Sequence, residues 1–160
     1  MARRLQELEG VEGAAIDLDL VYEILDPQRR PKADSVIWSA ARRVAGRLAA
    51  SVLVEGRPVV AEGGFSGEGE LNEFVAGLPA GVHPQLVLLD VEFTKAFERA
   101  SADRTRGVSR NRTFLSRHYR EFVSVWDNAD VLHLDTGQAT VDESADTVME
   151  WLAWRSSLSR

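Results

Sequence analysis

Four short apolar stretches, separated by segments with helical periodicity, constrain the fold more than any other feature of this chain. They cover residues 14–16, 59–61, 85–91 and 131–134. Because strands that alternate with helices along a chain form parallel sheets, this order predicts an α/β fold. The uninterrupted apolar run at 85–91 is typical of a strand that is covered on both faces. We therefore expect a three-layer αβα arrangement around a mostly parallel sheet.

Helical patterns fill the intervals between the expected strands. The longest, at residues 35–54, places apolar and small residues on one face and begins after Asp34 or Ser35, either of which serves as an N-cap. Arg42, Arg43 and Arg47 fall mostly on the opposite, polar face of this helix. The other helices are expected at residues 2–9, 20–25, 70–78, 92–100, 114–126 and from Thr140 or Asp142 to residue 152.

Length and composition narrow the classes of protein further. A chain of 160 residues forms one domain with a core of its own, so we expect a single domain over residues 1–160. The absence of cysteine excludes disulfides and thiolate metal sites, and three dispersed histidines do not suggest a metal centre. No apolar run has the length of a membrane span, and no signal peptide is seen at the N-terminus. We expect a cytoplasmic protein that does not attach to membranes.

Acidic residues follow the first two expected strands. Asp17 closes the stretch at 14–16 and Asp19 comes two residues later, while Glu62 closes the stretch at 59–61 and precedes two glycines. Since open α/β sheets bind their ligands at the carboxyl ends of the strands, these three acids are candidate catalytic residues. Two plainer interpretations stay open. Asp19 could be only the N-cap of the next helix, and the glycines could form only a turn.

An arginine-rich stretch stands out in a chain whose net charge is −6. Residues 99–120 contain seven arginines, and a glycine and a serine in the middle predict a loop between two helices. Arginine forks match phosphate oxygens in pairs, so such a loop suits closure over a nucleotide or another polyanion. The alternative is a solvated helical surface whose arginines pair with acids at helical spacing. The negative net charge does not favour nucleic acid as the partner.

The order of these features resembles the P-loop kinases of the shikimate-kinase and chloramphenicol-phosphotransferase type over nearly the whole chain. The segment "IDLDLVYEIL" resembles the part after the second strand of that family, and "GRPVVAEGGF" resembles its third strand and the following loop. The segment "FERASADRTRGVSRNRTFLSRHYREF" resembles the lid. The segment "VLHLDTGQATVDESADTVMEWL" resembles the final strand, the loop near the adenine and the last helix.

The resemblance implies an ATP- and Mg²⁺-dependent kinase of a small-molecule hydroxyl, with a lid at about residues 101–112. Asp17 would lie near the metal shell, Asp19 near the acceptor, and Glu62 would help to place the acceptor or a metal-bound water. The residues assigned to the phosphates are Arg99, Arg104, Arg106 and Arg110. The residues assigned to the adenine side are Thr136 and Gly137.

The P-loop of this family, G-x-x-x-x-G-K-[ST], is absent from the sequence. The segment "ARRLQEL" resembles the helix that follows this motif. The first strand of the family, which lies between the third and the fourth strands of its sheet, is also missing. Three explanations are open: an N-terminal truncation of an ordinary kinase, a natural relative whose flanking strands pair directly, or a second chain that supplies the strand. For the chain as given, we expect weak ATP binding and little or no phosphotransfer.

Two further classes of function are compatible with the sequence. The first is a non-catalytic module that binds a nucleotide, a phosphate or another polyanion through the arginine face at residues 104–120. The second is a regulatory protein whose exposed sheet edges pair with a partner, and it predicts an oligomer in solution. These two classes can be distinguished from a kinase by their required residues, because only a kinase needs Asp17 and Glu62.

Overall fold

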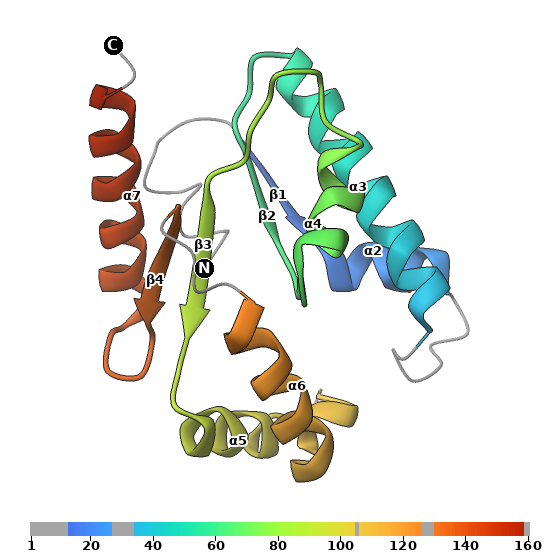
Figure 1. Ribbon diagram of the computed structural model, residues 1–160, viewed down its shortest axis with the longest axis vertical. Helices are drawn as coiled ribbons and strands as arrows, with labels where there is room; N and C mark the ends of the chain where they lie inside the picture. Colours follow the sequence, from blue (N-terminus) through green and yellow to red (C-terminus); the bar gives the residue numbers. More distant parts are fainter. Residues whose placement is uncertain (1–12, 27–33, 105, 126–129, 159–160) are drawn as a thin grey trace. The chain divides into compact units, whose positions relative to one another are not determined.

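A computed structural model gives the arrangement of the chain in two compact units that meet in the sequence between Pro84 and Gln85. It describes residues 13–26, 34–104, 106–125 and 130–158. Each unit combines helices with one pair of short parallel strands, which are drawn as arrows in Figure 1. The predicted alternation of helices and parallel strands is thereby confirmed for the described residues.

The first unit is organised around its longest helix, α3. Its elements are β1 (Ala14–Asp17), α2 (Leu18–Leu25), α3 (Ser35–Val54), β2 (Val59–Glu62) and α4 (Glu68–Val75). Helix α3 contacts both strands and both of the other helices, and in Figure 1 α4 lies beside it while α2 crosses it near one end. This helix therefore connects all the elements that carry the residues of interest in this unit.

The second unit contains the arginine-rich stretch. Its elements are β3 (Leu86–Asp90), α5 (Phe93–Ala102), the 3₁₀ turn η1 (Val108–Arg110), α6 (Arg112–Val125), β4 (Val131–Asp135) and α7 (Val141–Leu158). Helices α5 and α6 contact each other and η1, while α7 packs along β4 (Figure 1). The arginines therefore lie on a helical hairpin that leaves the sheet after β3 and returns to it at β4.

Both strand pairs are parallel, and each places one terminal acid beside another. In the first unit Asp17 is in register with Glu62, and in the second Asp90 is in register with Asp135. The single sheet expected from the sequence is seen as two separate two-stranded sheets. Among the described residues, each strand therefore has one edge without a strand neighbour.

A compact apolar core holds the first unit together. It is built from one side each of α2 and α3, together with a residue of β1 and one of α4. Its buried members are Ile16, Leu18, Val21, Tyr22, Ala41, Ala45, Ala49 and Phe74. Three alanines spaced four residues apart leave room on α3 for the larger side chains of α2, and the Tyr22 ring lies 4.5 Å from that of Trp38.

Two glycines mark the closest approach of α3 to the end of α4. A Cβ atom on Gly46 would lie 2.1 Å from the carbonyl oxygen of Phe74. A Cβ atom on Gly77 would lie 2.7 Å from the carbonyl carbon of Gly46. Real Cβ contacts are longer than both distances, so the backbones meet here only because neither residue has a side chain.

The beginnings of the long helices follow from side-chain caps. The Oδ1 atom of Asp34 accepts hydrogen bonds from the N–H groups of Val36 and Ile37 at 2.9 and 3.3 Å, so Asp34 is the N-cap of α3. Thr140 and Glu143 bond reciprocally to each other's backbone N–H at the start of α7, which is a capping box. The predicted helix at residues 2–9 lies outside the described residues.

The buried residues of the second unit come from its strands and from the inner sides of α5 and α7. They are Leu88, Ala100, Leu134, Ser144, Ala145 and Val148. Leu89, which follows Leu88 in β3, is 43 % exposed. The expectation that both faces of this strand are covered is therefore not met within the part of the chain that the structure describes.

Candidate functional site

The first pair of acids lies at the carboxyl end of the sheet in the first unit. Asp17 ends β1 and Glu62 ends β2, and the parallel register puts the two residues on adjacent strands. Neighbouring strands lie about 4.8 Å apart, so two carboxylates in register share a small region of space. Asp17 is half-buried and Glu62 is exposed. Two of the three predicted catalytic acids are therefore brought together.

Asp17, and not Asp19, is the N-cap of α2. The Oδ1 atom of Asp17 accepts a hydrogen bond from the N–H of Asp19 at 2.8 Å, and the helix begins at Leu18. The alternative in which Asp19 caps this helix is therefore wrong. Asp19 is exposed in the first helical turn, where the partial positive charge of the helix end favours a carboxylate.

The two glycines after β2 differ in their surroundings. A Cβ atom on Gly63 would lie 2.7 Å from the Cβ of Leu18, whereas nothing lies within 4 Å of the corresponding point on Gly64. Gly63 is therefore needed for packing of the loop against α2. Gly64 leaves an open surface next to Glu62.

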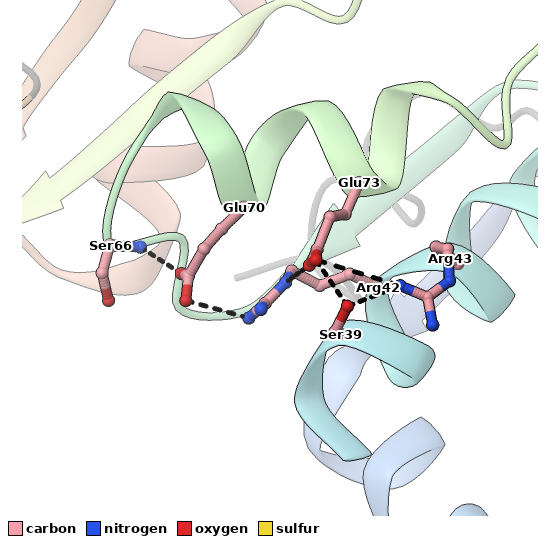
Figure 2. A network of polar contacts seen from close by, with 6 residues as sticks. All are labelled: Ser39, Arg42, Arg43, Ser66, Glu70 and Glu73. Atoms are coloured by element: carbon pink, nitrogen blue, oxygen red, sulfur yellow. Dashed lines mark hydrogen bonds and ion pairs between the residues drawn. The ribbon is translucent and has the colours of Figure 1, made fainter. Parts of the chain in front are cut away.

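A polar network behind this loop was missed by the sequence interpretation. The side chain of Arg42 is 7 % exposed and its guanidinium contacts two carboxylates, with Nη1 3.2 Å from Oε1 of Glu70 and Nε 2.6 Å from Oε2 of Glu73. Figure 2 shows this cation lying between the two acids of α4. The assignment of Arg42 to the polar face of α3 is therefore wrong. The sequence did contain a signal of this burial. Arg42 precedes Gly46 by four residues and Ala49 by seven, a spacing that puts all three on one face of the helix.

The same network reaches the loop that follows β2. The Oε2 atom of Glu70 accepts a hydrogen bond from the N–H of Ser66 at 2.6 Å. Glu73 also accepts a hydrogen bond from the hydroxyl of Ser39 at 2.5 Å, and this bond, followed by the bond from Arg42, lowers the pKa of Glu73. Arg42 therefore positions the loop through Glu70 while Glu73 remains ionised (Figure 2).

In the second unit, the acids at the strand ends bind nearby backbone groups. The Oδ1 atom of Asp90 accepts from the N–H of Val91, and the Oδ1 atom of Asp135 accepts from the N–H of Gly137, both at 2.7 Å. The bond accepted by Asp135 spans the turn that follows β4, and the N–H of Thr136 donates to the carbonyl oxygen of Asp90. The loop that begins with Thr136 is thereby folded back toward the end of β3.

Two cations of α5 bind this loop. Arg99 donates from Nη2 to the carbonyl oxygen of Thr136 at 2.8 Å and from Nη1 to its hydroxyl at 3.3 Å. Lys95 donates from Nζ to the carbonyl oxygen of Gly137. The structure therefore joins Arg99, one of the predicted phosphate residues, to Thr136, one of the two predicted adenine-side residues, although 37 positions separate them. Lys95 was not singled out from the sequence.

No family model and no curated protein matches this chain. No helix of the described residues is both long enough and apolar enough to cross a membrane. Within those residues, no group of three or more histidine, cysteine, aspartate or glutamate side chains has the arrangement of a metal site.

The connection between α5 and α6 falls within the segment at about residues 101–112 where a lid is expected. Helix α5 continues to Ala102 and α6 begins at Arg112, so the connection covers residues 103–111, of which residue 105 is not described. The lid arginines Arg104, Arg106 and Arg110 are exposed. Arg106 forms a surface ion pair with Asp103 at 3.5 Å, as the solvated-surface alternative predicts for that one pair.

Aromatic rings support the hairpin that carries the arginines. The Arg112 guanidinium lies 5.6 Å from the Phe93 ring centroid and 5.3 Å from that of Phe97, and the ring of Tyr119 packs edge-on against Phe93. Burial, followed by the charge of Asp90 and then of Glu92, raises the pKa of the Tyr119 phenol. Arg112 is therefore held against two aromatic rings at the start of α6, next to the arginine-rich connection.

Proposed function

We propose that this chain is a cytoplasmic kinase-like phosphotransferase domain with a P-loop-kinase-like αβα fold. The parent family phosphorylates small-molecule hydroxyls, and we propose that this activity is impaired or lost here because the P-loop is absent from the sequence. The order of its elements supports the proposal, because strands, acids, arginine hairpin and terminal loop follow one another as in that family. The observation that carries it is the bond between Arg99 and Thr136. It links the arginine-rich stretch directly to the loop assigned to the adenine.

The acids of the first unit would serve the acceptor and the metal. Asp17 and Glu62 offer two carboxylates on adjacent strands. Magnesium in kinases is commonly bound by one or two carboxylates together with substrate phosphates, so this pair fits a magnesium ion or its water shell. Asp19, exposed at the first turn of α2, would orient the acceptor hydroxyl.

The exposed arginines of the lid would neutralise the phosphates. Phosphoryl transfer depends on positioning and on neutralisation of charge more than on covalent chemistry. Arg104 and Arg110 are exposed and Arg106 has only a surface ion pair in the part of the chain that is described, so their charges remain available to an anion. Because the sequence contains no G-x-x-x-x-G-K-[ST], we expect this polypeptide to bind ATP weakly and to transfer little or no phosphate.

Calorimetric titration of the full chain with MgATP tests the proposal. Arg104→Gln should weaken ATP binding by about tenfold, and Asp17→Asn or Glu62→Gln should weaken binding of MgATP more than that of metal-free ATP. Arg47→Gln in α3 removes the same charge from an exposed site and serves as the control. Absence of any ATP binding, or equal effects of Arg104→Gln and Arg47→Gln, would contradict a nucleotide site.

A second candidate function is the binding of a polyanion without catalysis. It is favoured by the positive charge of residues 99–120. This stretch contains seven arginines and one aspartate, whereas the whole chain has a net charge of −6. This candidate predicts that inorganic tripolyphosphate binds with an affinity that falls steeply with salt and is unchanged by Asp17→Asn and Glu62→Gln. A requirement for both acids would decide against it.

A third candidate is a regulatory protein that pairs through a sheet edge. It is favoured by the two-stranded sheets, because a strand edge with free backbone groups can accept another strand. Sedimentation velocity over a range of concentrations tests this candidate. It predicts a homo-oligomer, and a monomer at all concentrations would argue against self-association.

A further inference from the structure

The loop at residues 135–137 begins with the last residue of β4, and its polar groups are extensively bonded. The N–H and the hydroxyl of Thr136 both donate to the carbonyl oxygen of Asp90, at 2.7 and 2.9 Å. The N–H of Gly137 donates to Asp135. The carbonyl oxygens of Thr136 and Gly137 accept from Arg99 and Lys95 respectively.

Lys95 and Arg99 act on the loop from one side of one helix. They are four residues apart in α5, so their side chains leave the helix on the same face. Lys95 is half-buried, and Arg99 uses both of its terminal nitrogens on Thr136. The two cations therefore form a clamp that ties the loop after β4 to the helix that leads into the lid.

This geometry separates Arg99 from the other arginines of the stretch. A phosphate would compete for the same two nitrogens, and binding it would release both bonds to Thr136. Arg104 and Arg110 lie beyond the end of α5 and are exposed. These two residues can reach an anion without disturbing the loop.

We infer that Lys95 and Arg99 are positioning residues that hold the loop at 135–137 against the end of β3, and that Arg99 is not a phosphate ligand. Only the identity of the ligand in this inference rests on the proposed function. If a nucleotide binds, Arg104 and Arg110 contact its phosphates, and the clamp fixes the loop on the side of the base.

Hydrogen exchange followed by NMR on the full chain tests the clamp without any ligand. Arg99→Gln and Lys95→Met should each speed exchange of the Thr136 and Gly137 amides by about tenfold, because the loop loses one or two hydrogen bonds. Lys95→Arg keeps a cationic donor and should restore slow exchange. Arg104→Gln and Arg47→Gln should leave both amides as in the wild type. Unchanged exchange in Arg99→Gln and Lys95→Met would overturn the inference.

Titration with inorganic tripolyphosphate, which has no base, tests the second half of the inference. Arg104→Gln should weaken binding by about tenfold, whereas Arg99→Gln should match the Arg47→Gln control within about twofold. Arg99→Gln should instead change the ratio of the ATP and tripolyphosphate affinities. Equal weakening of tripolyphosphate by Arg99→Gln and Arg104→Gln would overturn the inference.

The exchange and titration experiments also distinguish failure of this inference from failure of the proposed function. A wild-type chain that binds neither ATP nor tripolyphosphate would contradict the proposed function. The amide exchange rates would still decide whether Lys95 and Arg99 hold the loop, because that measurement needs no ligand.

Discussion

Arg42 and Glu73 are joined by a hydrogen-bonded ion pair in which Nε lies 2.6 Å from Oε2, and the arginine side chain is only 7 % exposed. The same guanidinium binds Glu70, which in turn holds the N–H of Ser66. One buried cation therefore connects α3 to α4 and to the loop after β2. The position of that loop, and of the open surface at Gly64, depends on a residue outside it.

Replacing Arg42 should destabilise the first unit. Arg42→Met keeps the length of the side chain but leaves two carboxylates without their cation, and we expect a loss of about 2 to 3 kcal/mol in the free energy of unfolding. Arg43→Met is the matched control, because Arg43 is 49 % exposed and lies 3.9 Å from Glu73, so its loss should cost less than about 0.5 kcal/mol. Urea denaturation followed by tryptophan fluorescence measures both. Equal losses would contradict a special role for Arg42.

The stability of the chain should depend on the ionisation of Glu73. Its pKa lies below the ordinary value of 4.5, chiefly because of the Ser39 hydroxyl and then of Arg42. A carboxylate whose pKa is lower in the folded state stabilises the fold above its unfolded pKa, and this contribution is lost as the pH falls through the folded pKa. Urea midpoints measured below pH 4.5 should therefore fall more steeply in the wild type than in Glu73→Gln. Parallel curves would show that Glu73 is not coupled to folding.

The glycine contact between α3 and α4 should tolerate no side chain. Gly46→Ala would place a Cβ atom 2.1 Å from the carbonyl oxygen of Phe74, and we expect it to destabilise the unit by about 2 kcal/mol or more. Gly69→Ala is the contrasting variant, because Gly69 is also helical but meets nothing within 4 Å. It should stabilise α4 by about 0.5 to 1 kcal/mol. Thermal unfolding of the two variants distinguishes packing from helix propensity.

Much of the fold was predictable because it follows from local periodicity. The strands ending at Asp17, Glu62, Asp90 and Asp135 were located from short apolar runs. Helix α3 was placed from its apolar face, with Asp34 as one of two candidate N-caps and an end at about Val54. The arrangement of the strands in two pairs was not predicted. It depends on contacts between distant residues, which local periodicity does not encode.

The capping box of α7 should contribute measurably to stability. Thr140→Ala removes the hydroxyl that accepts from the N–H of Glu143, and we expect a loss of about 1 kcal/mol. Thr147→Ala in the middle of the same helix is the control, because its exposed hydroxyl only donates to the carbonyl of Glu143. Circular dichroism during thermal unfolding measures the difference. A similar effect of the two substitutions would show that the cap is unimportant.

The candidate site was less predictable than the fold. The acids were found because they close apolar strands, but "DLD" contains two aspartates, and only the structure shows that Asp17 is the one that caps α2. Arg42 was missed because its partners lie about thirty residues away in α4, and a lone arginine in a helix resembles a solvated one. The bond of Lys95 goes to the backbone carbonyl of Gly137, and a contact with a backbone group leaves no trace in the sequence.

The parallel pairing of the strands has a consequence for the order of folding. Ala14 pairs with Val59 and Leu86 pairs with Val131, and in each case the partner is 45 positions further along the chain. Closing loops of this length costs entropy that local contacts must first offset. Helices α3 and α5 form from contacts between residues only a few positions apart, and their formation can shorten the distance between the strands that pair. We therefore expect each sheet to assemble late, after the helices between its strands, and the acids at the strand ends to meet only in the last step.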